Sequence, residues 1–142
     1  MNVLAVMCFL LGILAWMSSY MTPSHDIAPD ANAIATNYII YRNAAFNYAE
    51  KHHSSGVISS SSLTLPSGWT AVRNWQARID SSHCYVWGQA TNDEISAARK
   101  LLWESYATGR AESGRLVPGN GAVISLPAFV GNGNLVSVIR LD

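Results

Sequence analysis

The sequence predicts an α+β domain preceded by one transmembrane helix. Three observations support this: an uncharged apolar run at the N-terminus, two segments with the period of amphipathic helices, and short strand-like segments separated by turn residues. The order of elements is helix, two or three strands, helix, two strands. That order favours an antiparallel sheet, because it does not repeat strand–helix–strand units. A chain of 142 residues is consistent with one domain.

A membrane anchor is predicted over residues 1–21. Residues 3–21 contain no Asp, Glu, Lys or Arg, and their 19 positions approach the roughly 20 that cross a bilayer as a helix. Trp16 and Tyr20 lie near the end of this run, where amphipathic rings favour the membrane interface. A cleaved signal peptide is the alternative, but no basic residue precedes the run and Met17–Tyr20 is a poor cleavage site. We therefore expect a retained single-pass anchor, with the N-terminus inside and the domain on the far side.

Residues 22–30 are predicted to form a linker, and residues 31–142 a single domain. Pro23 and Pro29 stop the anchor helix from running into the domain. Asp30 is predicted to be the N-cap of the first helix, because its carboxylate can accept from the free amides of the first turn.

The first helix of the domain has one aromatic-rich face. Its apolar side chains recur at spacings of four and three residues, which is the period of an amphipathic helix. They are Ile34, Tyr38, Tyr41, Ala45 and Tyr48. We expect this face to be core and the helix to end between His52 and Gly56.

The middle of the domain is predicted to contain a β-hairpin. Residues 57–65 hold a run of serines and are expected to be a loop or a short edge strand. Residues 69–79 alternate as a strand does, and residues 84–89 form the next strand. Asp80–Ser82 supplies the turn between them.

A second helix is predicted to begin after Thr91. Thr91 and Glu94 have the spacing of a capping box. The apolar face of this helix consists of Ile95, Ala98, Leu102 and Tyr106, with Leu101 beside it. Gly109 is predicted to end the helix, because glycine commonly follows the last helical residue.

The C-terminal part is predicted to be a long loop followed by a second hairpin. Residues 110–121 are rich in glycine and are expected to form the loop. Residues 122–130 and 135–141 are expected to be strands joined by the Gly-Asn turn at 131–134. Pro127 places the first of these strands at a sheet edge.

The charge composition argues against a nucleic-acid binder and is consistent with a surface that is partly covered by partners. Nine basic and nine acidic side chains give a net charge of zero, whereas a nucleic-acid binder needs a basic stripe. We therefore expect no nucleic-acid partner. Charged residues make up 13% of the chain, against about 25% in an ordinary soluble domain. The deficit suggests either a Ser-, Asn-, Gly- and Thr-rich surface or one partly covered by partners.

Histidine and cysteine do not form a recognisable metal or nucleophile motif. Adjacent His52 and His53 point away from each other on a helix. No histidine follows His83–Cys84, unlike in papain-like enzymes, although a permuted order with an earlier histidine stays open. Cys84 is expected to be buried rather than paired with another chain. Cys8 lies in the anchor, so no bridge within the chain is expected.

Two acidic pairs have the residue types of a glycosidase, namely Asp93 with Glu94 and Glu104 with Glu112. Helix capping and the helix dipole explain the first pair, and no motif surrounds the second. The tryptophans of the domain are expected to fill its core rather than to stack on sugars. We therefore expect no catalytic, metal or cofactor-binding residues, and no enzyme activity.

Four segments form a recognisable combination. They are the uncharged leader MNVLAVMCFLLGILAW, the helix YRNAAFNYA at 41–49, the turn LPSGW at 65–69 and the strand YVW at 85–87. Together they resemble the PilM proteins of conjugative-plasmid thin pili, a type IVb pilus system, over nearly the whole chain. The resemblance implies a non-enzymatic, membrane-associated component needed to build the pilus, and it supplies no catalytic or ligand residues.

From this resemblance we expect an assembly or scaffold factor in the inner membrane whose periplasmic domain binds other pilus-machinery proteins, with oligomers possible. One alternative is a pilin-like minor structural subunit, and another is a small cell-wall-acting hydrolase. Prepilins share an apolar N-terminal helix before an α+β head. They need a Glu five residues after the cleavage glycine, however, and Met17 stands at that position after Gly12.

A partner surface is predicted on the first helix. Ile39, Ile40 and Phe46 lie off its apolar stripe, so this helix needs apolar cover on more than one side. The sheet covers one side, and the other must be covered by the second helix or by another protein chain. Exposed apolar patches usually mark protein contacts.

Overall fold

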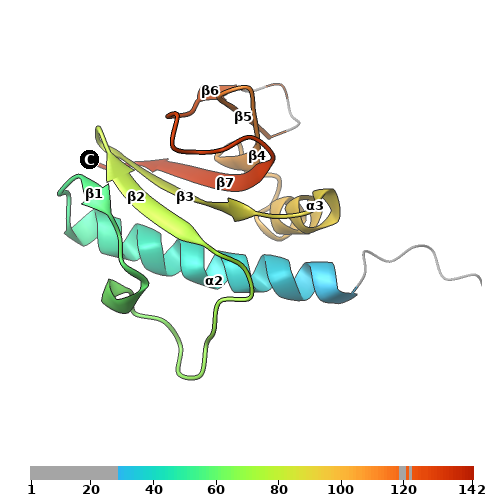
Figure 1. Ribbon diagram of the computed structural model, residues 1–142, viewed down its shortest axis with the longest axis horizontal. Helices are drawn as coiled ribbons and strands as arrows, with labels where there is room; N and C mark the ends of the chain where they lie inside the picture. Colours follow the sequence, from blue (N-terminus) through green and yellow to red (C-terminus); the bar gives the residue numbers. More distant parts are fainter. Residues whose placement is uncertain (1–28, 119–120, 122) are drawn as a thin grey trace, which may run out of the picture.

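A long helix lies lengthwise along one face of an antiparallel sheet (Figure 1). The computed structural model describes residues 29–118, 121 and 123–142. The predicted anchor and most of the predicted linker lie outside these residues. Within them, two α-helices and a seven-stranded antiparallel sheet confirm the predicted α+β class. No helix in this described part is long and apolar enough to cross a membrane.

The last strand in the sequence occupies the centre of the sheet. The helices are α2 (Pro29–Lys51), η1 (Ser60–Ser62, a 3-10 helix) and α3 (Asn92–Leu101). The strands are β1 (Gly56–Val57), β2 (Gln76–Asp80), β3 (His83–Gln89), β4 (Thr108–Glu112), β5 (Arg115–Val117), β6 (Ile124–Ser125) and β7 (Asn134–Arg140). Their order across the sheet is β1-β2-β3-β7-β4-β5-β6.

Helix α2 begins at Pro29, two residues earlier than the predicted N-cap at Asp30 implies. Asp30 lies inside the first turn and is not the N-cap, which corrects the prediction. Proline suits the first turn because its missing N–H has no helical partner there. The carboxylate of Asp30 still lies near the positive end of the helix dipole. Tyr38, Tyr41 and Ala45 are buried, which confirms the predicted core face.

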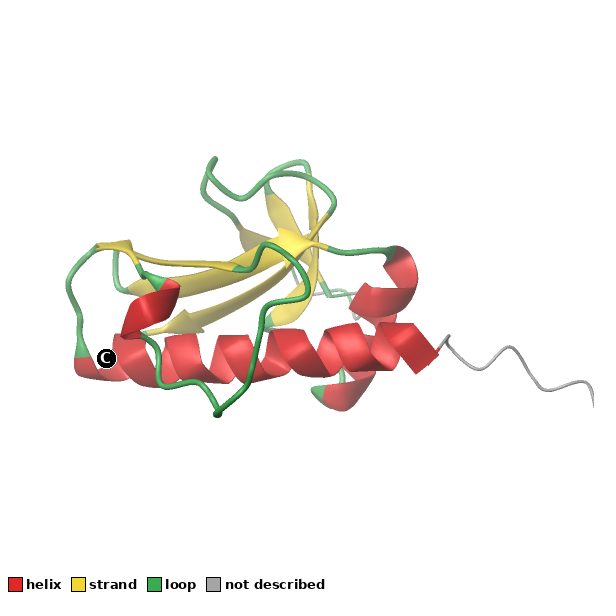
Figure 2. Ribbon diagram, turned by 60° about the horizontal axis from the view of Figure 1, so that its bottom comes forward, coloured by secondary structure: helices red, strands yellow, loops and turns green. Residues whose placement is uncertain are grey.

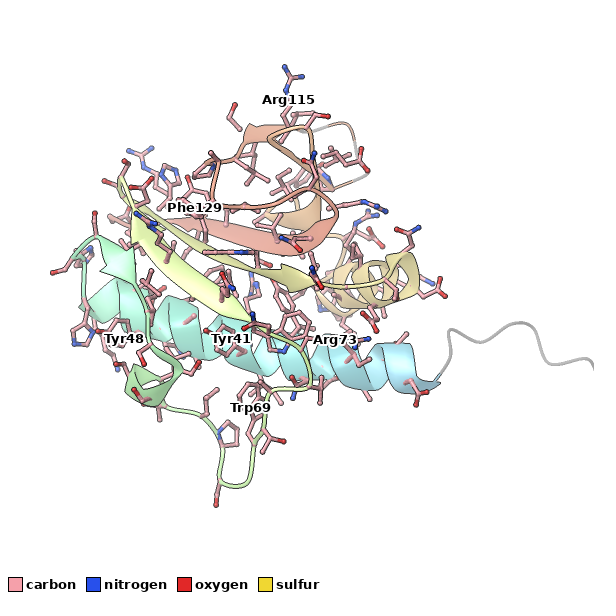
Figure 3. All side chains as sticks on the ribbon, viewed as in Figure 1. Tyr41, Tyr48, Trp69, Arg73, Arg115 and Phe129 are labelled. Carbon is pink, nitrogen blue, oxygen red and sulfur yellow. The ribbon has the colours of Figure 1, made fainter. Side chains whose placement is uncertain are left out.

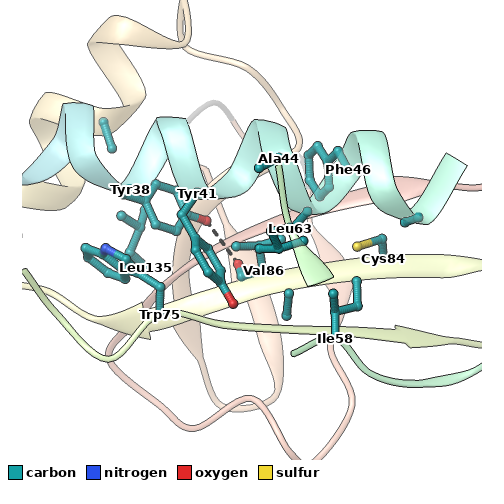
Figure 4. Packing of buried hydrophobic residues seen from close by; sticks show 14 of the residues in the cluster. Tyr38, Tyr41, Ala44, Phe46, Ile58, Leu63, Trp75, Cys84, Val86 and Leu135 are labelled. Atoms are coloured by element: carbon teal, nitrogen blue, oxygen red, sulfur yellow. Dashed lines mark hydrogen bonds between the residues drawn. The ribbon is translucent and has the colours of Figure 1, made fainter. Parts of the chain in front are cut away.

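Tyr38 attaches α2 to three strands at once. Its hydroxyl donates to the carbonyl oxygen of Val86 at 3.0 Å and lies 2.9 Å from Oγ of Ser137. That serine hydroxyl is in turn 2.7 Å from Oγ1 of Thr108. The four residues come from α2, β3, β7 and β4, and all are buried. Figure 4 shows Tyr38 and Val86 among the core residues. A fully hydrogen-bonded polar chain of this kind fixes how the helix sits on the sheet.

Both faces of the sheet are covered. The near face shares one core with α2 and α3, and these helices also contact each other (Figure 2). The far face carries a second cluster, which consists of Tyr85, Trp87, Ala111, Leu116, Leu126, Val130, Val136 and Val138. Because strand β5 and the segment after β6 supply part of this cluster, the C-terminal region folds back over the sheet.

The β2–β3 hairpin is confirmed, but its first strand is shorter than predicted. Asp80 pairs with His83 across the turn, and the strand begins at Gln76 rather than at residue 69. The side chain of Asn37 on α2 explains the difference. It donates to the carbonyl of Thr70 at 2.8 Å and accepts from the backbone N–H of Val72 at 3.2 Å. These backbone groups are therefore bound to the helix and not to a neighbouring strand.

The second helix is shorter than predicted, and the loop predicted at 110–121 is partly wrong. The capping box of Thr91 and Glu94 is confirmed, but α3 ends at Leu101. Residues 108–117 form the β4–β5 hairpin instead. Gly109 lies in β4, where an added Cβ would be 2.4 Å from the carbonyl oxygen of Val117. The glycine therefore allows close backbone approach between strands and does not end a helix.

The predicted C-terminal hairpin is also wrong. Strand β7 pairs with β3 and β4, whereas β6 pairs with β5 at the sheet edge. Strand β7 is buried over Leu135–Val138, which suits the centre of a sheet. Pro127 follows the short edge strand β6 rather than interrupting it.

Candidate contact surfaces

The C-terminal end of α3 has an unusual residue at its cap. The N–H of Trp103 donates to the carbonyl of Lys100 at 3.1 Å, and the N–H of Glu104 donates to that of Arg99 at 2.8 Å. These two bonds are those of a Schellman motif, whose left-handed residue is usually glycine. Here Trp103 and Glu104 adopt φ values of 55° and 52°. Left-handed backbone at a bulky residue costs about 1–2 kcal/mol.

The strained tryptophan and two apolar residues close to it in the sequence are exposed. Trp103 is 93% exposed, Tyr106 63% and Leu101 46%. We call these three residues the α3-end patch. Lys100 is exposed beside it, and Arg99 is paired with Glu104. The prediction that the tryptophans fill the core is therefore wrong at Trp103, because α3 ends before it and turns its side chain outwards.

A second apolar surface is a groove beside β2, at the point where the short edge strand β1 ends. Strand β1 pairs with Arg78 and Ile79, and the N–H of Ile58 after it still donates to the carbonyl of Ala77 at 2.9 Å, so the groove opens only beyond that bond. Its volume is about 380 Å³, and Val57 beside it is 76% exposed. The β2-edge groove is lined by Tyr41, Ile58, Trp75, Arg78, Trp87 and Phe129, among others. Figure 3 shows Tyr41 and Phe129 on opposite sides of β2, so the groove wraps around the strand edge.

Aromatic contacts hold the walls of the β2-edge groove in place. The Trp75 indole N–H donates to Oδ1 of Asn37 at 2.8 Å, and the Trp75 ring meets Tyr38 edge-on at 5.0 Å. On the other wall, the Arg78 guanidinium lies 4.7 Å from the centre of the Phe129 ring. A groove with fixed aromatic walls and one cation suits an apolar or aromatic side chain of an extended peptide.

The predicted partner residues Ile39, Ile40 and Phe46 do not form one exposed surface. Phe46 is 7% exposed and belongs to the near-face core, and the Arg42 guanidinium lies 4.4 Å from the centre of its ring. Ile39 is half-buried against the same core. Ile40 keeps intermediate exposure. The structure therefore places Phe46 inside the chain's own packing, and a partner role for Ile39 and Ile40 stays a prediction.

Three of the four acidic residues considered as catalytic have structural contacts. Glu94 is buried; its Oε1 accepts from Arg73 at 2.6 Å and its Oε2 accepts from the backbone N–H of Thr91 at 2.9 Å. Glu104 pairs with Arg99, and Glu112 lies 3.6 Å from Arg110. The polar pocket of about 420 Å³ in front of Arg73 and Glu94 is therefore lined by a helix-capping carboxylate that is already bound.

Cys84 is buried and free, as predicted. Burial raises the pKa of its thiol from 9.0 to about 12, although the nearby Arg42 opposes the shift. A protonated thiol is a poor nucleophile and a poor metal ligand. Among the described residues, no group of three or more His, Cys, Asp or Glu is placed to hold a metal ion.

Comparison with known proteins agrees with the sequence resemblance. The PilM family model matches residues 6–138. The chain belongs to the PilM family. A crystal structure of PilM from Escherichia coli B7A is similar, with a TM-score of 0.62 and 25% sequence identity. The match covers 84% of this chain and 98% of that one. No protein with a curated description matches the chain. Membership of the PilM family indicates a role in pilus biogenesis.

Proposed function

We propose that the protein is a non-enzymatic, membrane-anchored assembly factor of a type IVb pilus. Its single-pass anchor lies in the inner membrane, and its domain binds other pilus-machinery proteins in the periplasm. The β2-edge groove is the observation that carries this proposal, because an apolar hollow beside an incompletely covered strand suits an extended segment of a partner. Membership of the PilM family supports the pilus system as the source of that partner.

Site-specific photo-crosslinking tests this proposal in cells that carry the full pilus operon. A photoreactive residue at Val57, next to the groove, should give adducts with other pilus proteins. The same residue at Arg115, which is exposed on β5 (Figure 3), is the matched control and should give few. Strong adducts at Arg115 with none at Val57 would show that the partner does not bind at the groove. A position at Ile40 tests the predicted surface on α2 in the same cells.

A pilin-like minor subunit is the second candidate. The long helix α2, packed lengthwise on an antiparallel sheet, favours it, since prepilin heads have the same combination. The two candidates differ in where the protein ends up. An assembly factor stays with the membrane when pili are sheared from cells, and a subunit is recovered in the fibres. Digestion of peptidoglycan by the purified protein would contradict both.

A further inference from the structure

Trp103 is placed where folding alone would favour a different residue. Its backbone is left-handed, which disfavours every bulky side chain, and its ring is 93% exposed. The ring therefore gains little from packing within the domain. Strain held at an exposed residue is a reason to look for a contact outside the molecule.

The chemistry around Trp103 is that of a membrane interface. Trp and Tyr are the residues that gather at the level of lipid headgroups, and Lys100 supplies positive charge beside them, whereas Arg99 is paired with Glu104. With 93% of its surface exposed, the Trp103 side chain protrudes from the domain. A protruding ring needs a matching pocket on a protein, whereas the soft headgroup layer of a bilayer accepts it without one.

The position of the α3-end patch brings it within reach of the membrane. Helix α3 contacts α2 and lies beside the half of α2 that begins at Pro29 (Figures 1 and 2). Residues 22–28 join Pro29 to the anchor predicted over residues 1–21. Seven extended residues reach about 25 Å at most, so this end of the domain stays close to the bilayer. Such a short tether also makes a weak surface contact effective.

We propose that the α3-end patch rests on the lipid surface, with the Trp103 ring in the headgroup layer and Lys100 facing anionic lipids. The inference rests on the membrane anchor of the proposed function. It adds a second attachment, which orients the domain so that the β2-edge groove faces away from the bilayer. Val57 follows the C-terminal end of α2, and the 23 residues of that helix span about 34 Å.

Quenching of tryptophan fluorescence by brominated lipid tests the inference on the full chain. The protein is reconstituted into phosphatidylethanolamine and phosphatidylglycerol vesicles, with and without bromine on the acyl chains. Flotation of the vesicles first shows whether the chain is anchored. The contribution of Trp103 is the quenching measured for wild type minus the quenching measured for Trp103→Phe. This subtraction removes the background from the other tryptophans. Because the residue is exposed, this variant should fold, and circular dichroism checks that it does.

A matched control moves the exposed tryptophan to the other end of the domain. Val57→Trp in the Trp103→Phe background again carries one additional exposed tryptophan, next to the β2-edge groove. We expect brominated lipid to quench wild type more strongly than Trp103→Phe, and Val57→Trp to add no lipid-dependent quenching.

The other outcomes overturn the inference in distinguishable ways. If the chain floats with the vesicles but wild type and Trp103→Phe are quenched equally, the patch does not touch lipid and the anchor stands. If the chain does not float, the anchor of the proposed function fails and the inference fails with it. If Trp103 is shielded only when other pilus proteins are added, the patch binds protein and not lipid.

Discussion

The end of α3 and the β2-edge groove both expose apolar side chains, but their shapes are opposite. At the end of α3 a single ring stands out from a strained backbone. At the edge of β2 several aromatic residues line a hollow of about 380 Å³. A protruding ring suits a deformable partner, and a hollow suits a side chain or strand of defined shape. The α3-end patch lies beside the half of α2 that begins at Pro29, whereas the groove runs from Tyr41, in the middle of α2, to Val57 beyond its C-terminal end. We infer that one domain serves two kinds of contact.

The β2–β3 turn shows, by contrast, why a left-handed tryptophan is unusual. The β2–β3 turn also has two consecutive non-glycine residues in left-handed backbone, Ser81 at 48° and Ser82 at 65°. There the conformation matches the twist of the two strands, as tight hairpin turns require. At Trp103 a helix cap requires the same conformation, but a glycine would provide it without strain. The serines are explained by the fold, and the tryptophan is not.

The largest expected effect is at Phe46, which packs α2 into the near-face core. Phe46→Ala should lower the free energy of unfolding by about 3–5 kcal/mol, because it empties a buried aromatic site. Ile40→Ala, six residues earlier and less buried, is the comparison and should cost about 1 kcal/mol or less. Urea denaturation of both variants measures the difference. A larger loss at Ile40 than at Phe46 would mean that the core is wrongly placed.

A smaller substitution should disturb the β2-edge groove alone. An added Cβ at Gly88 would lie 2.4 Å from Cε3 of Trp75, so Gly88→Ala must displace a wall of the groove. Overpacking of this kind costs about 1–3 kcal/mol. Crosslinking at Val57 should fall, while lipid quenching of Trp103 should persist.

Gly131→Ala is the control for the groove substitution. Its Cβ meets only the flexible end of the Asn134 side chain, at 3.3 Å, so it should change stability by about 0.5 kcal/mol or less. If Gly88→Ala left crosslinking at Val57 unchanged, the groove would not be the contact.

Alkaline pH should loosen both regions together, because they share the core under α2. Burial raises the pKa of Cys84 from 9.0 to about 12, and it raises the pKa of Tyr38 as well. The unfolded chain releases these protons at lower pH than the folded chain does. Stability is therefore fully present below pH 9.0 and is lost as the pH rises towards about 12. Each pH unit in this window costs at most about 1.4 kcal/mol per group.

Cys84→Ala separates the two contributions to the pH dependence. The variant should lose less stability per pH unit above 9.0 than wild type, because the thiol no longer contributes and only the tyrosines whose pKa burial raises, Tyr38, Tyr41 and Tyr85, still do. Denaturant unfolding at a series of pH values gives the slope of the unfolding free energy against pH for wild type and for Cys84→Ala. Equal slopes in the two proteins would show that the thiol does not contribute.

Local patterns predicted the elements that depend on local chemistry. The period of apolar residues predicted α2, the spacing of Thr91 and Glu94 predicted the start of α3, and Asp80–Ser82 predicted the first hairpin turn. Non-local pairing was missed. Strand β7 lies between β3 and β4, and nothing in its own residues distinguishes that arrangement from a hairpin with β6. The role of Gly109 was missed for the same reason, because it depends on a backbone that approaches from another strand.

The candidate surfaces were harder to predict than the fold. Ile39, Ile40 and Phe46 were selected because they lie off the apolar stripe of α2, but Phe46 is covered within the chain. A signal for Trp103 was present, since it lies outside the apolar face predicted for the second helix. Its exposure, however, depends on where α3 ends, and that end was placed too late in the chain. The β2-edge groove depends on residues from five separate segments, so no sequence spacing could indicate it.

The smallest expected effect tests the central claim that Trp103 serves a contact and not the fold. Trp103→Gly relieves the left-handed strain, and Trp103→Ala keeps it, while both remove the ring. The free energy of unfolding of Trp103→Gly should therefore exceed that of Trp103→Ala by about 1 kcal/mol in urea denaturation. The measurement is the unfolding free energy of the two variants beside the piliation of cells that express them. We predict that Trp103→Gly is at least as stable as wild type and that both variants lose piliation. A glycine variant less stable than wild type, or full piliation in both variants, would contradict the claim.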